Sequence, residues 1–202
     1  MTAIIDYNMG NLQSVKNALI KIDEKAKIVK DPNKLKEFDR VILPGVGAFK
    51  DAMSHLKTSG LDEAIFDFIK SGKPFLGICL GMQLLFDESE EFGKHKGLGL
   101  IEGSVKKFDK NIFKTPLKVP HMGWNEIEIK NSALFDKLDK KFYLYFVHSY
   151  HVVCDDRYAI GECHYGYDFV AAVQKDNIFG IQPHPEKSHE NGLKILKNFT
   201  RI

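Results

Sequence analysis

The 202-residue sequence has 44% hydrophobic and 28% charged side chains, which are ordinary values for a globular protein and exclude a disordered or collagen-like chain. Its 29 lysines and arginines nearly balance its 27 aspartates and glutamates. The net charge of +2 gives no reason to expect a nucleic-acid or membrane surface. We therefore expect one domain over residues 1–202 that binds a small molecule or another protein.

The cysteines and the first residues indicate a compartment. Cys79, Cys154 and Cys163 are odd in number and have no paired close spacing, which argues against a disulfide framework and favours a reducing environment. The segment 1–10 reaches Asp6 after only a few apolar residues, too few for the core of a signal peptide. No run approaches 18 apolar residues. These observations predict a cytoplasmic protein.

The first ninety residues alternate short apolar runs with helical patterns. Strands are predicted at 2–6, 26–29 and 41–43, and residues 75–86 read as a strand that gives way to a helix. Helices are predicted over 11–22, 48–57 and 61–71, where apolar residues recur at three- and four-residue spacing. Strands that alternate with helices predict an α/β fold with a mostly parallel central sheet covered by helices on both faces.

From about residue 98 the pattern changes to strands and turns, which predicts a smaller antiparallel sheet. The strand-like segments are 99–108, 125–129, 142–153, 158–166 and 169–182. The turn residues 175–177 lie between two apolar runs and predict a hairpin. A final helix is predicted over roughly 188–200.

A single cysteine stands between two glycines in “GICLG” (77–81), where the predicted strand meets the predicted helix. This spacing is typical of a nucleophile elbow, in which a sharp turn lifts the reactive atom clear of the sheet. The glycines allow the close backbone approach. The position at the start of a helix favours the thiolate form of Cys79.

A nucleophilic thiol needs a base, and the base needs a group that orients it. Of the eight histidines, only His184 has a carboxylate in its own segment, at Glu186. Side chains two positions apart share a face in an extended chain, and Pro183 and Pro185 restrict the backbone there. Because reactive groups gather beyond the carboxyl ends of parallel strands, we expect Cys79 and His184 at one rim.

Acyl chemistry also needs donors for an oxyanion. The backbone N–H of Leu80, directly after the nucleophile, is the expected first donor. A second is expected from the loop “LPGVGAF” (43–49), where Gly45 and Gly47 leave the peptide groups around Val46 free to point either way. Such a loop could switch a site on by a peptide flip.

Each of these features also has a simpler interpretation. A buried cysteine is usually inert, and Cys154 and Cys163 are expected to be packing residues, but the elbow and the His-x-Glu segment together favour a nucleophile at Cys79. His148 and His151 are three apart and would face opposite sides of one strand, so no metal site is expected. The glycine loop lacks the remaining residues of a nucleotide motif, and no cofactor is expected.

The segments “GICLGMQLLF”, “PGVGAF” and “HPEKS” together resemble the class I (triad) glutamine amidotransferases, which hydrolyse glutamine to glutamate and ammonia. Within that family the sequence is similar to the glutaminase subunits of imidazole glycerol phosphate synthase. The segments “IIDYNMGNLQSV”, “VPHMGWNEI”, “YFVHSY” and “HPEKSHENGLKILKNF” occur in the same order over essentially the whole chain. The resemblance implies a single-domain flavodoxin-like fold.

The resemblance also implies roles for individual residues. It makes Cys79 the nucleophile, His184 the general base and acid, and Glu186 the carboxylate that orients His184. The implied oxyanion donors are at Leu80 and, after a peptide flip, at Gly45 and Val46. The implied glutamine site comprises Gly47, Gln83, Ser149 and Tyr150.

The implied partner is a (β/α)8-barrel cyclase that forms a heterodimer with the chain. It would take ammonia through a tunnel, add it to a phosphoribulosyl-formimino carboxamide ribotide, and release imidazole glycerol phosphate and an aminoimidazole carboxamide ribotide. Met122, Trp124 and Lys187 are expected at the interface. The partner's own ligand would drive the peptide flip.

Several alternatives stay open at this point. Asn8 and Pro183 stand where the family usually has glycine and phenylalanine, which leaves room for a paralogous partner, such as one for acetamidino sugar modification. A cysteine hydrolase or stress protein of the related fold usually has histidine after the cysteine, where this sequence has Leu80. Glutaminase domains for guanylate or anthranilate synthesis usually have histidine at Met82 and lack “PHMGWN”. A catalytically idle scaffold is a further alternative.

Overall fold

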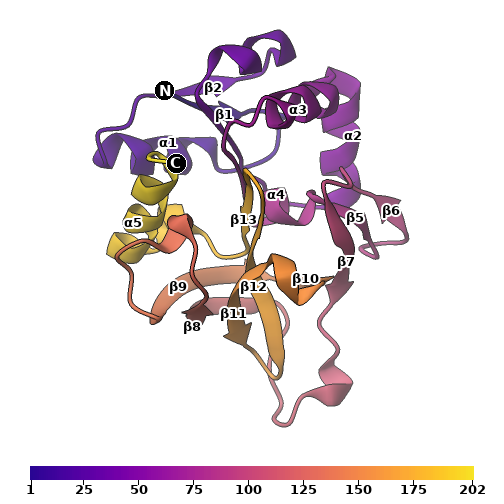
Figure 1. Ribbon diagram of the computed structural model, residues 1–202. Coiled ribbons are helices and arrows are strands. Elements are labelled where there is room, and N and C mark those ends of the chain that lie inside the picture. The colour runs from indigo at the N-terminus through magenta and orange to yellow at the C-terminus, as the bar shows by residue number, and fades with distance from the viewer.

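A 13-stranded sheet forms the centre of the molecule, and the computed structural model describes all of residues 1–202 (Figure 1). Its first half is parallel, as predicted, in the order β2-β1-β3-β4-β13. These strands are β1 (Thr2–Ile5), β2 (Ala26–Val29), β3 (Arg40–Leu43), β4 (Phe75–Ile78) and β13 (Ile178–Ile181). Every residue of β1, β4 and β13 is buried, which is the pattern of strands covered on both faces.

Helices cover both faces of this parallel half, which confirms the predicted α/β architecture. On one side lie α1 (Leu12–Lys21) and α5 (His189–Phe199), and on the other lie α2 (Phe49–Ser59) and α3 (Leu61–Lys70) (Figure 1). Neighbouring residues of the strands alternate between the two resulting cores, so that Ile4 packs with α1 and α5 while Ala3 and Ile5 pack with α2 and α3. Each fully buried Leu, Ile or Phe side chain contributes about 1.5–3 kcal/mol.

The helix after the cysteine turn is much shorter than its apolar run suggests. Helix α4 comprises only Leu80–Gln83, and the chain then enters β5 (Phe86–Ser89). The carbonyl groups of Leu84 and Leu85 accept hydrogen bonds from the backbone of residues 98–101. These tertiary hydrogen bonds end the helix because they take up the carbonyl groups that a further turn would need.

The second half of the sheet is largely antiparallel. Beyond β13 follow β12 (Asp168–Lys175), β10 (Tyr150–Cys154), β7 (Ile101–Lys107), β5 and β6 (His95–Lys96). The remaining strands, β11 (Ala159–His164), β8 (His121–Ile129) and β9 (Lys141–His148), branch from β12 through β11. The smaller antiparallel group is therefore joined to the main sheet. The predicted hairpin is confirmed, since β12 and β13 pair across residues 176–177.

The segment 142–153 was predicted as one strand, and the structure divides it at Ser149 into β9 and β10. Strand β9 pairs with β8 while β10 pairs with β7. The chain therefore bends at Ser149, because its two halves pair with different strands. The prediction that His148 and His151 face opposite sides of a strand is therefore wrong. Both rings are buried against Phe108, with centroid distances of 5.2 and 4.8 Å.

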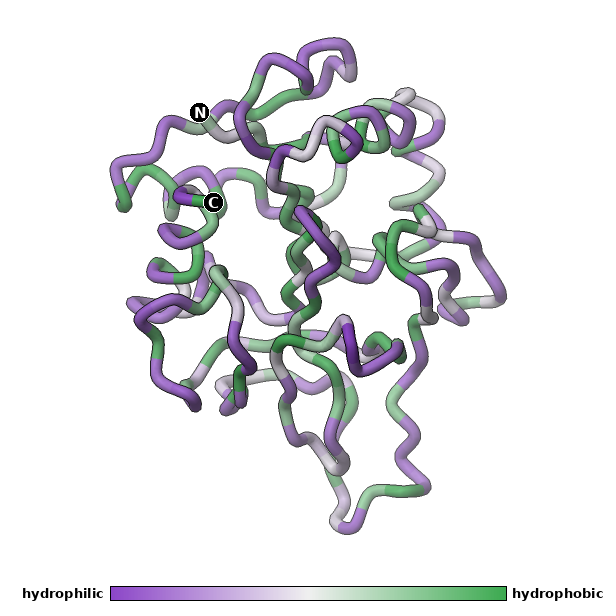
Figure 2. Tube along the Cα trace, in the orientation of Figure 1, coloured by the Kyte–Doolittle hydropathy of each residue, from purple (hydrophilic) through white to green (hydrophobic).

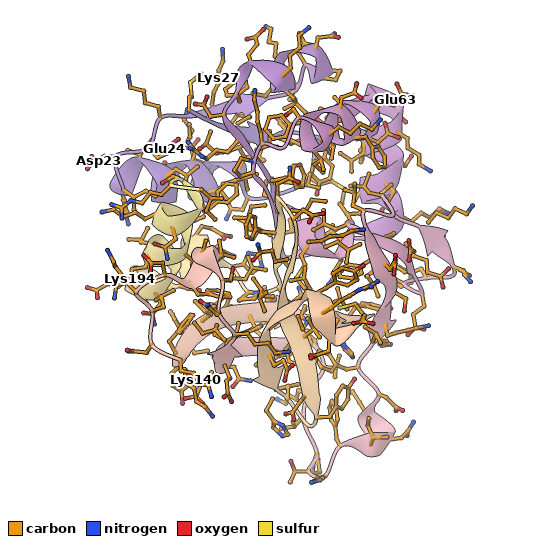
Figure 3. The ribbon with its side chains drawn as sticks, viewed as in Figure 1. Asp23, Glu24, Lys27, Glu63, Lys140 and Lys194 are labelled. Carbon is orange, nitrogen blue, oxygen red and sulfur yellow. The ribbon has the colours of Figure 1, made fainter.

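Five short 3-10 turns complete the chain: η1 (Pro32–Glu37), η2 (Lys110–Ile112), η3 (Ala133–Phe135), η4 (Asp156–Tyr158) and η5 (Pro185–Lys187). The trace is hydrophobic along the central strands and hydrophilic at the periphery (Figure 2). Charged side chains such as Asp23, Glu63 and Lys194 lie on the outside (Figure 3). None of the helices combines the length and the apolar character needed to span a bilayer.

Candidate active site

Cys79 occupies a sharp turn between β4 and α4. Its φ of 56° and ψ of −112° are unusual for a residue with a Cβ atom and cost about 1–3 kcal/mol. Its backbone N–H donates to the Ile181 carbonyl oxygen at 2.8 Å, which ties the turn to β13. A Cβ atom on Gly81 would lie 1.8 Å from the Leu43 carbonyl oxygen, and one on Gly77 would lie 2.5 Å from the Gly81 oxygen. The two glycines are thus required by the close packing of the turn.

His184 follows the next strand of the sheet. Strands β4 and β13 are parallel neighbours in direct register, so Cys79 and His184 both leave the same end of the sheet. The imidazole Nδ1 lies 2.8 Å from Glu186 Oε1, and these side chains are only 3% and 2% exposed. The backbone N–H of His184 donates to the Tyr145 carbonyl oxygen at 2.9 Å. The ring is therefore fixed by its own segment and by β9.

The charge on His184 depends on its two neighbours. Burial on its own lowers the pKa of His184, but the interactions with the Cys79 sulfur and the Glu186 carboxylate outweigh burial and raise this pKa from 6.5 to about 10. The second ring nitrogen, Nε2, is buried without a hydrogen-bond partner. A protonated imidazole beside a thiolate can give its proton to a leaving group.

A hollow of about 320 Å³ opens above the cysteine, within the size range of small-molecule sites. The residues that line it come from the turn after β3, the cysteine turn with α4, the segment after β5, the residue before β8, the junction of β9 and β10, and the segment after β13. They are Val46, Gly47, Cys79, Leu80, Gln83, Glu91, Pro120, Val147, His148, Ser149, Tyr150 and His184. Segments far apart in the sequence thus meet around one thiol.

Most of the residues that were predicted to bind the substrate or to stabilise the oxyanion line this hollow. Gly47, Gln83, Ser149 and Tyr150 do so, as do Leu80 and Val46. Gly45 does not line it; this glycine is buried beneath the loop, where a Cβ atom would come within 2.4 Å of the Tyr7 hydroxyl.

The residues predicted at a partner interface lie outside the hollow. Met122 and Trp124 are 62% and 46% exposed, and the Trp124 indole stacks on His189 with a centroid distance of 5.0 Å. Lys187 is also exposed, with its Nζ 5.9 Å from the Tyr145 ring. These side chains form an exposed apolar and cationic surface beside the site.

Comparison with known proteins places this geometry in a family. The sequence model of the glutamine amidotransferase class-I family matches residues 3–202. The chain belongs to this family. It is 63% identical to “Imidazole glycerol phosphate synthase subunit HisH” of Sulfurimonas denitrificans over 100% of the chain and 98% of that relative. It is 57% identical to the protein of the same name from Wolinella succinogenes over 100% of both.

Solved structures show the same fold at low sequence identity. The amidotransferase chain superimposes on the structure of PurLQS from Thermotoga maritima with a TM-score of 0.76, at 21% identity, over 99% of this chain and 97% of that one. A crystal structure titled glutamine amidotransferase gives a TM-score of 0.76 at 17% identity, over 98% and 97% of the two chains.

Two residues close to Cys79 or to its hollow were not predicted from the sequence. Glu91 is the only carboxylate in the lining of the hollow, and its Oε2 accepts the Phe49 backbone N–H at 2.6 Å, so it can receive a cationic group of a ligand. Gln182 donates from Nε2 to the Cys79 sulfur at 3.7 Å. The acidic run 87–91 gave a weak indication of a functional carboxylate at Glu91. For Gln182 the sequence offered only its position two residues before His184.

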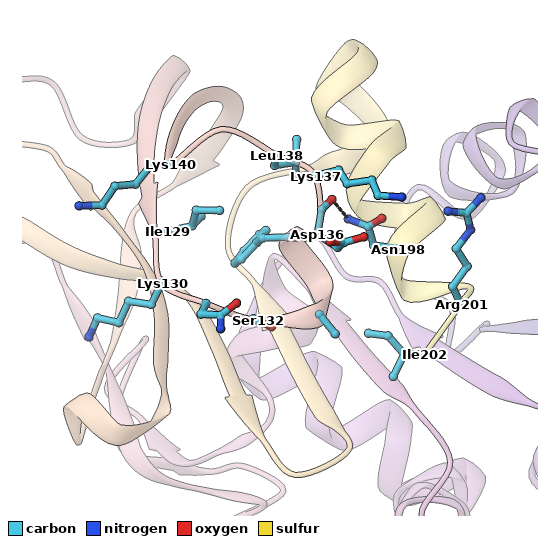
Figure 4. Close-up of a pocket in the computed structure, with 13 residues that line it drawn as sticks. Ile129, Lys130, Ser132, Asp136, Lys137, Leu138, Lys140, Asn198, Arg201 and Ile202 are labelled. Atoms are coloured by element: carbon cyan, nitrogen blue, oxygen red, sulfur yellow. Dashed lines mark hydrogen bonds between the residues drawn. The ribbon is translucent and has the colours of Figure 1, made fainter.

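A larger hollow, about 660 Å³, lies elsewhere, between the end of β8, η3 and the C-terminal end of α5 (Figure 4). Lys130 and Lys140 extend away from it (Figure 4), and both are paired with acidic side chains. Its lining contains neither cysteine nor histidine, so it has none of the nucleophile and base chemistry of the smaller one. Nowhere does the chain gather three or more His, Cys, Asp or Glu side chains in a group that could hold a metal ion.

Proposed function

We propose that this chain is the glutaminase subunit of an imidazole glycerol phosphate synthase. The observation that carries the proposal is the arrangement of Cys79 and His184 at the ends of adjacent parallel strands, around one hollow, with Glu186 bound to the far side of the imidazole. The names of the relatives supply the pathway, since matches over the whole chain at 63% and 57% identity are called subunits of that synthase.

The reaction follows from the positions of the groups. The Cys79 thiolate attacks the side-chain carbonyl carbon of glutamine, and the carbonyl electron pair moves to oxygen. Backbone N–H groups of Leu80 and of the loop at Val46 would stabilise that oxyanion. His184 gives its proton to the leaving nitrogen, so that ammonia departs and a glutamyl thioester remains. His184 then takes a proton from water, which attacks the thioester and restores the thiolate with release of glutamate.

The remaining lining residues could bind the α-amino acid end of glutamine, opposite the side-chain amide. The Glu91 carboxylate would receive the α-ammonium group, because it is the only anionic side chain in the lining. Gln83, Ser149 and Tyr150 offer polar groups at the same hollow. Cofactors are not part of the proposal, because a thiolate, an imidazole and water account for every bond made and broken.

The proposal includes a cyclase subunit that receives the ammonia and forms imidazole glycerol phosphate and an aminoimidazole carboxamide ribotide in histidine biosynthesis. The exposed Met122, Trp124 and Lys187 beside the site would contact it. The proposal places the protein in the cytoplasm, where its three free thiols would stay reduced.

A Cys79→Ala variant assayed with the cyclase subunit of the same organism tests the proposal. We expect glutamine-dependent turnover to vanish, while turnover supported by added ammonium salt continues, because the cyclase needs ammonia and not the thiol. Loss of both activities would indicate that the chain acts only as a scaffold. Wild-type activity with a paralogous barrel subunit, but not with this cyclase, would overturn the assignment to histidine biosynthesis.

A further inference from the structure

A continuous line of hydrogen bonds leads inward from the strand whose outer face carries Met122 and Trp124. On the inner face of this strand, β8, Asn125 Nδ2 lies 3.2 Å from His121 Nε2. The other nitrogen of His121, Nδ1, lies 3.0 Å from His148 Nε2. The remaining nitrogen of His148, Nδ1, lies 2.8 Å from the Tyr150 carbonyl oxygen.

The proton on each ring can be assigned from these partners. The Tyr150 carbonyl oxygen can only accept, so His148 Nδ1 carries the proton and its Nε2 is an acceptor. His121 must then donate from Nδ1, and its Nε2 accepts from Asn125. The Asn125 amide is oriented by two further contacts: its Nδ2 donates to the His164 carbonyl oxygen, and its Oδ1 accepts the Glu126 N–H. Every member of the line is satisfied with both rings neutral.

The neutral state agrees with the surroundings of the rings. Burial lowers the pKa of His121 from 6.5 to about 4 and that of His148 to about 3. The exposed fractions of the two residues are 2% and 6%. Protonation of either imidazole would convert its accepting nitrogen into a donor that faces another N–H group. The hydrogen bond at that nitrogen would then be lost.

The line continues from the Tyr150 carbonyl oxygen to the sulfur. Gln83 Nε2 donates to this oxygen at 3.1 Å and to Gln182 Oε1 at 3.0 Å. Gln182 Nε2 in turn donates to the Cys79 sulfur at 3.7 Å. The Tyr150 oxygen therefore receives one hydrogen bond from the histidine side and one from the glutamine side, and its position sets the amide that faces the thiol.

Packing alone does not require a histidine at position 121. The His121 ring stacks on Tyr165 and Phe146, with centroid distances of 4.0 and 4.8 Å, and a phenyl ring would fill the same space. Two buried imidazoles must instead have their nitrogens matched, or they cost stability. The direct pairing of His121 with His148 across β8 and β9 places this matched pair inside while Met122 faces outward.

We infer that His121 and His148 are positioning residues that hold the Tyr150 carbonyl group in place. Through Gln83 and Gln182, they also hold the amide that donates to the Cys79 sulfur. The position of this amide is thereby coupled to the position of β8, whose outer face carries Met122 and Trp124. This inference rests on the proposed function, since it assigns the outer face of β8 to the cyclase. A partner that shifts β8 would thereby shift the amide beside the thiolate.

Two substitutions at one position separate positioning from packing. The His121→Phe variant keeps the stacked ring and loses the donor to His148, whereas His121→Asn keeps a donor at the place of Nδ1 and loses the stack. With the cyclase bound, we expect His121→Phe to lower kcat for glutamate release about tenfold and His121→Asn to stay within about threefold of wild type. A merely structural role predicts the opposite order, with the phenylalanine variant near wild type, and would overturn the inference.

The neighbouring His151 offers a matched control. It is buried against the same Phe108 ring, but its nitrogens contact Val152 O and the Tyr167 hydroxyl and lie outside the line. We expect His151→Phe to keep kcat within about twofold of wild type. An equal loss of kcat in His151→Phe and His121→Phe would show that any buried histidine here matters, and the inference would fail.

A double-mutant cycle tests whether both ends belong to one line. If His121→Phe and Gln182→Met each cost about tenfold in kcat, we expect the double variant to lose about twentyfold rather than the hundredfold of independent sites. Independent losses would overturn the inference. The wild-type complex is measured first: absence of glutamate release there would count against the proposed function, while normal release with additive variants would count only against the line.

Discussion

At the scale of single residues, Cys79 combines a reactive atom with an unfavourable backbone. Its positive φ belongs to a tight turn in which Gly77 packs against the Gly81 backbone and Gly81 against Leu43. Asn8, which departs from the family's usual glycine, has a φ of 67°, and asparagine tolerates this region better than most residues. The departure therefore leaves the turn before α1 intact.

The strain at Cys79 leads to a first prediction. Both Cys79→Gly and Cys79→Ala remove the sulfur, but only glycine relieves a cost of about 1–3 kcal/mol, against a penalty of about 0.5–1 kcal/mol for its freedom in the unfolded chain. We expect Cys79→Gly to unfold at higher urea concentration than Cys79→Ala. Equal midpoints would show that the turn is not strained.

The charge on His184 gives a second prediction. Its pKa lies near 10, above the value of 6.5 expected in the unfolded chain, so its proton stabilises the folded state fully below pH 6.5, and this contribution is lost as the pH rises toward 10. We expect the NMR titration of His184 to shift to lower pH in Cys79→Ala and in Glu186→Gln. A midpoint unchanged by both substitutions would contradict the assigned cause.

The neutral pair His121 and His148 gives a third prediction, of opposite sign. Their pKa values are lowered to about 4 and 3 in the fold, so the unfolded chain binds more protons below pH 6.5 and stability falls as the pH drops from 6.5 toward 4. We expect the unfolding free energy of His121→Phe to depend less steeply on pH over that interval. The measurement is urea unfolding at a series of pH values.

The sequence predicted Cys79, His184 and Glu186 because each lies in a short motif with its own chemical logic. Glu91 and Gln182 were not predicted, because only the folded chain creates their contacts with Phe49 and Cys79. A carboxylate or an amide in an ordinary polar or apolar run has no local pattern that marks it as part of a site.

At the scale of elements, helix α5 holds the segment that carries Glu186. Gly192 lies so close to η5 that a Cβ atom would come within 1.9 Å of the Pro185 carbonyl oxygen. The backbone of η5 must therefore move if this glycine acquires a side chain, and the carboxylate that orients His184 moves with it.

This contact gives a fourth prediction, at Gly192. Alanine for glycine within a helix normally adds about 1 kcal/mol of stability, but here the clash with η5 should reverse the sign and also lower glutamine turnover. Lys194→Ala, at an exposed position of the same helix, serves as the control and should leave both unchanged. Gly192→Ala with raised stability and full activity would show that η5 has room to yield.

The regular elements of the parallel half were predictable because apolar spacing marks strands and amphipathic helices locally. The early end of α4 and the break between β9 and β10 were not. Both depend on partners that are distant in the sequence. The backbone of residues 98–101 forms hydrogen bonds with the carbonyl groups after α4, and the chain breaks at Ser149 because β9 pairs with β8 whereas β10 pairs with β7.

At the scale of the whole molecule, the parallel half carries the reactive groups, while the antiparallel branch carries the exposed surface beside them. The α/β class followed from the alternation of helices and strands. The joining of β8, β9 and β11 to the main sheet through β12 could not be predicted, because strand order depends on pairing choices that hydrophobic patterns leave open.

A fifth prediction concerns this exposed surface. Because the half-exposed Trp124 ring stacks on His189 and otherwise meets only the edge of Tyr145 among aromatic rings, we expect Trp124→Ala to weaken binding of the proposed cyclase about thirtyfold, as loss of a large aromatic anchor does, with little change in unfolding free energy. Ile112→Ala, in η2, removes another exposed apolar side chain and should leave binding unchanged. Titration calorimetry measures both.

The adjacency of β4 and β13 has a consequence for biosynthesis. Strand β13, which precedes His184, is the last of the sheet to be translated, and it inserts between β4 and β12. At about 5–20 residues per second, the ribosome adds Cys79 several seconds before His184. Under the proposed mechanism, a nascent polypeptide therefore carries an idle cysteine, and ammonia release begins only once translation has passed residue 186 and the centre of the sheet has closed.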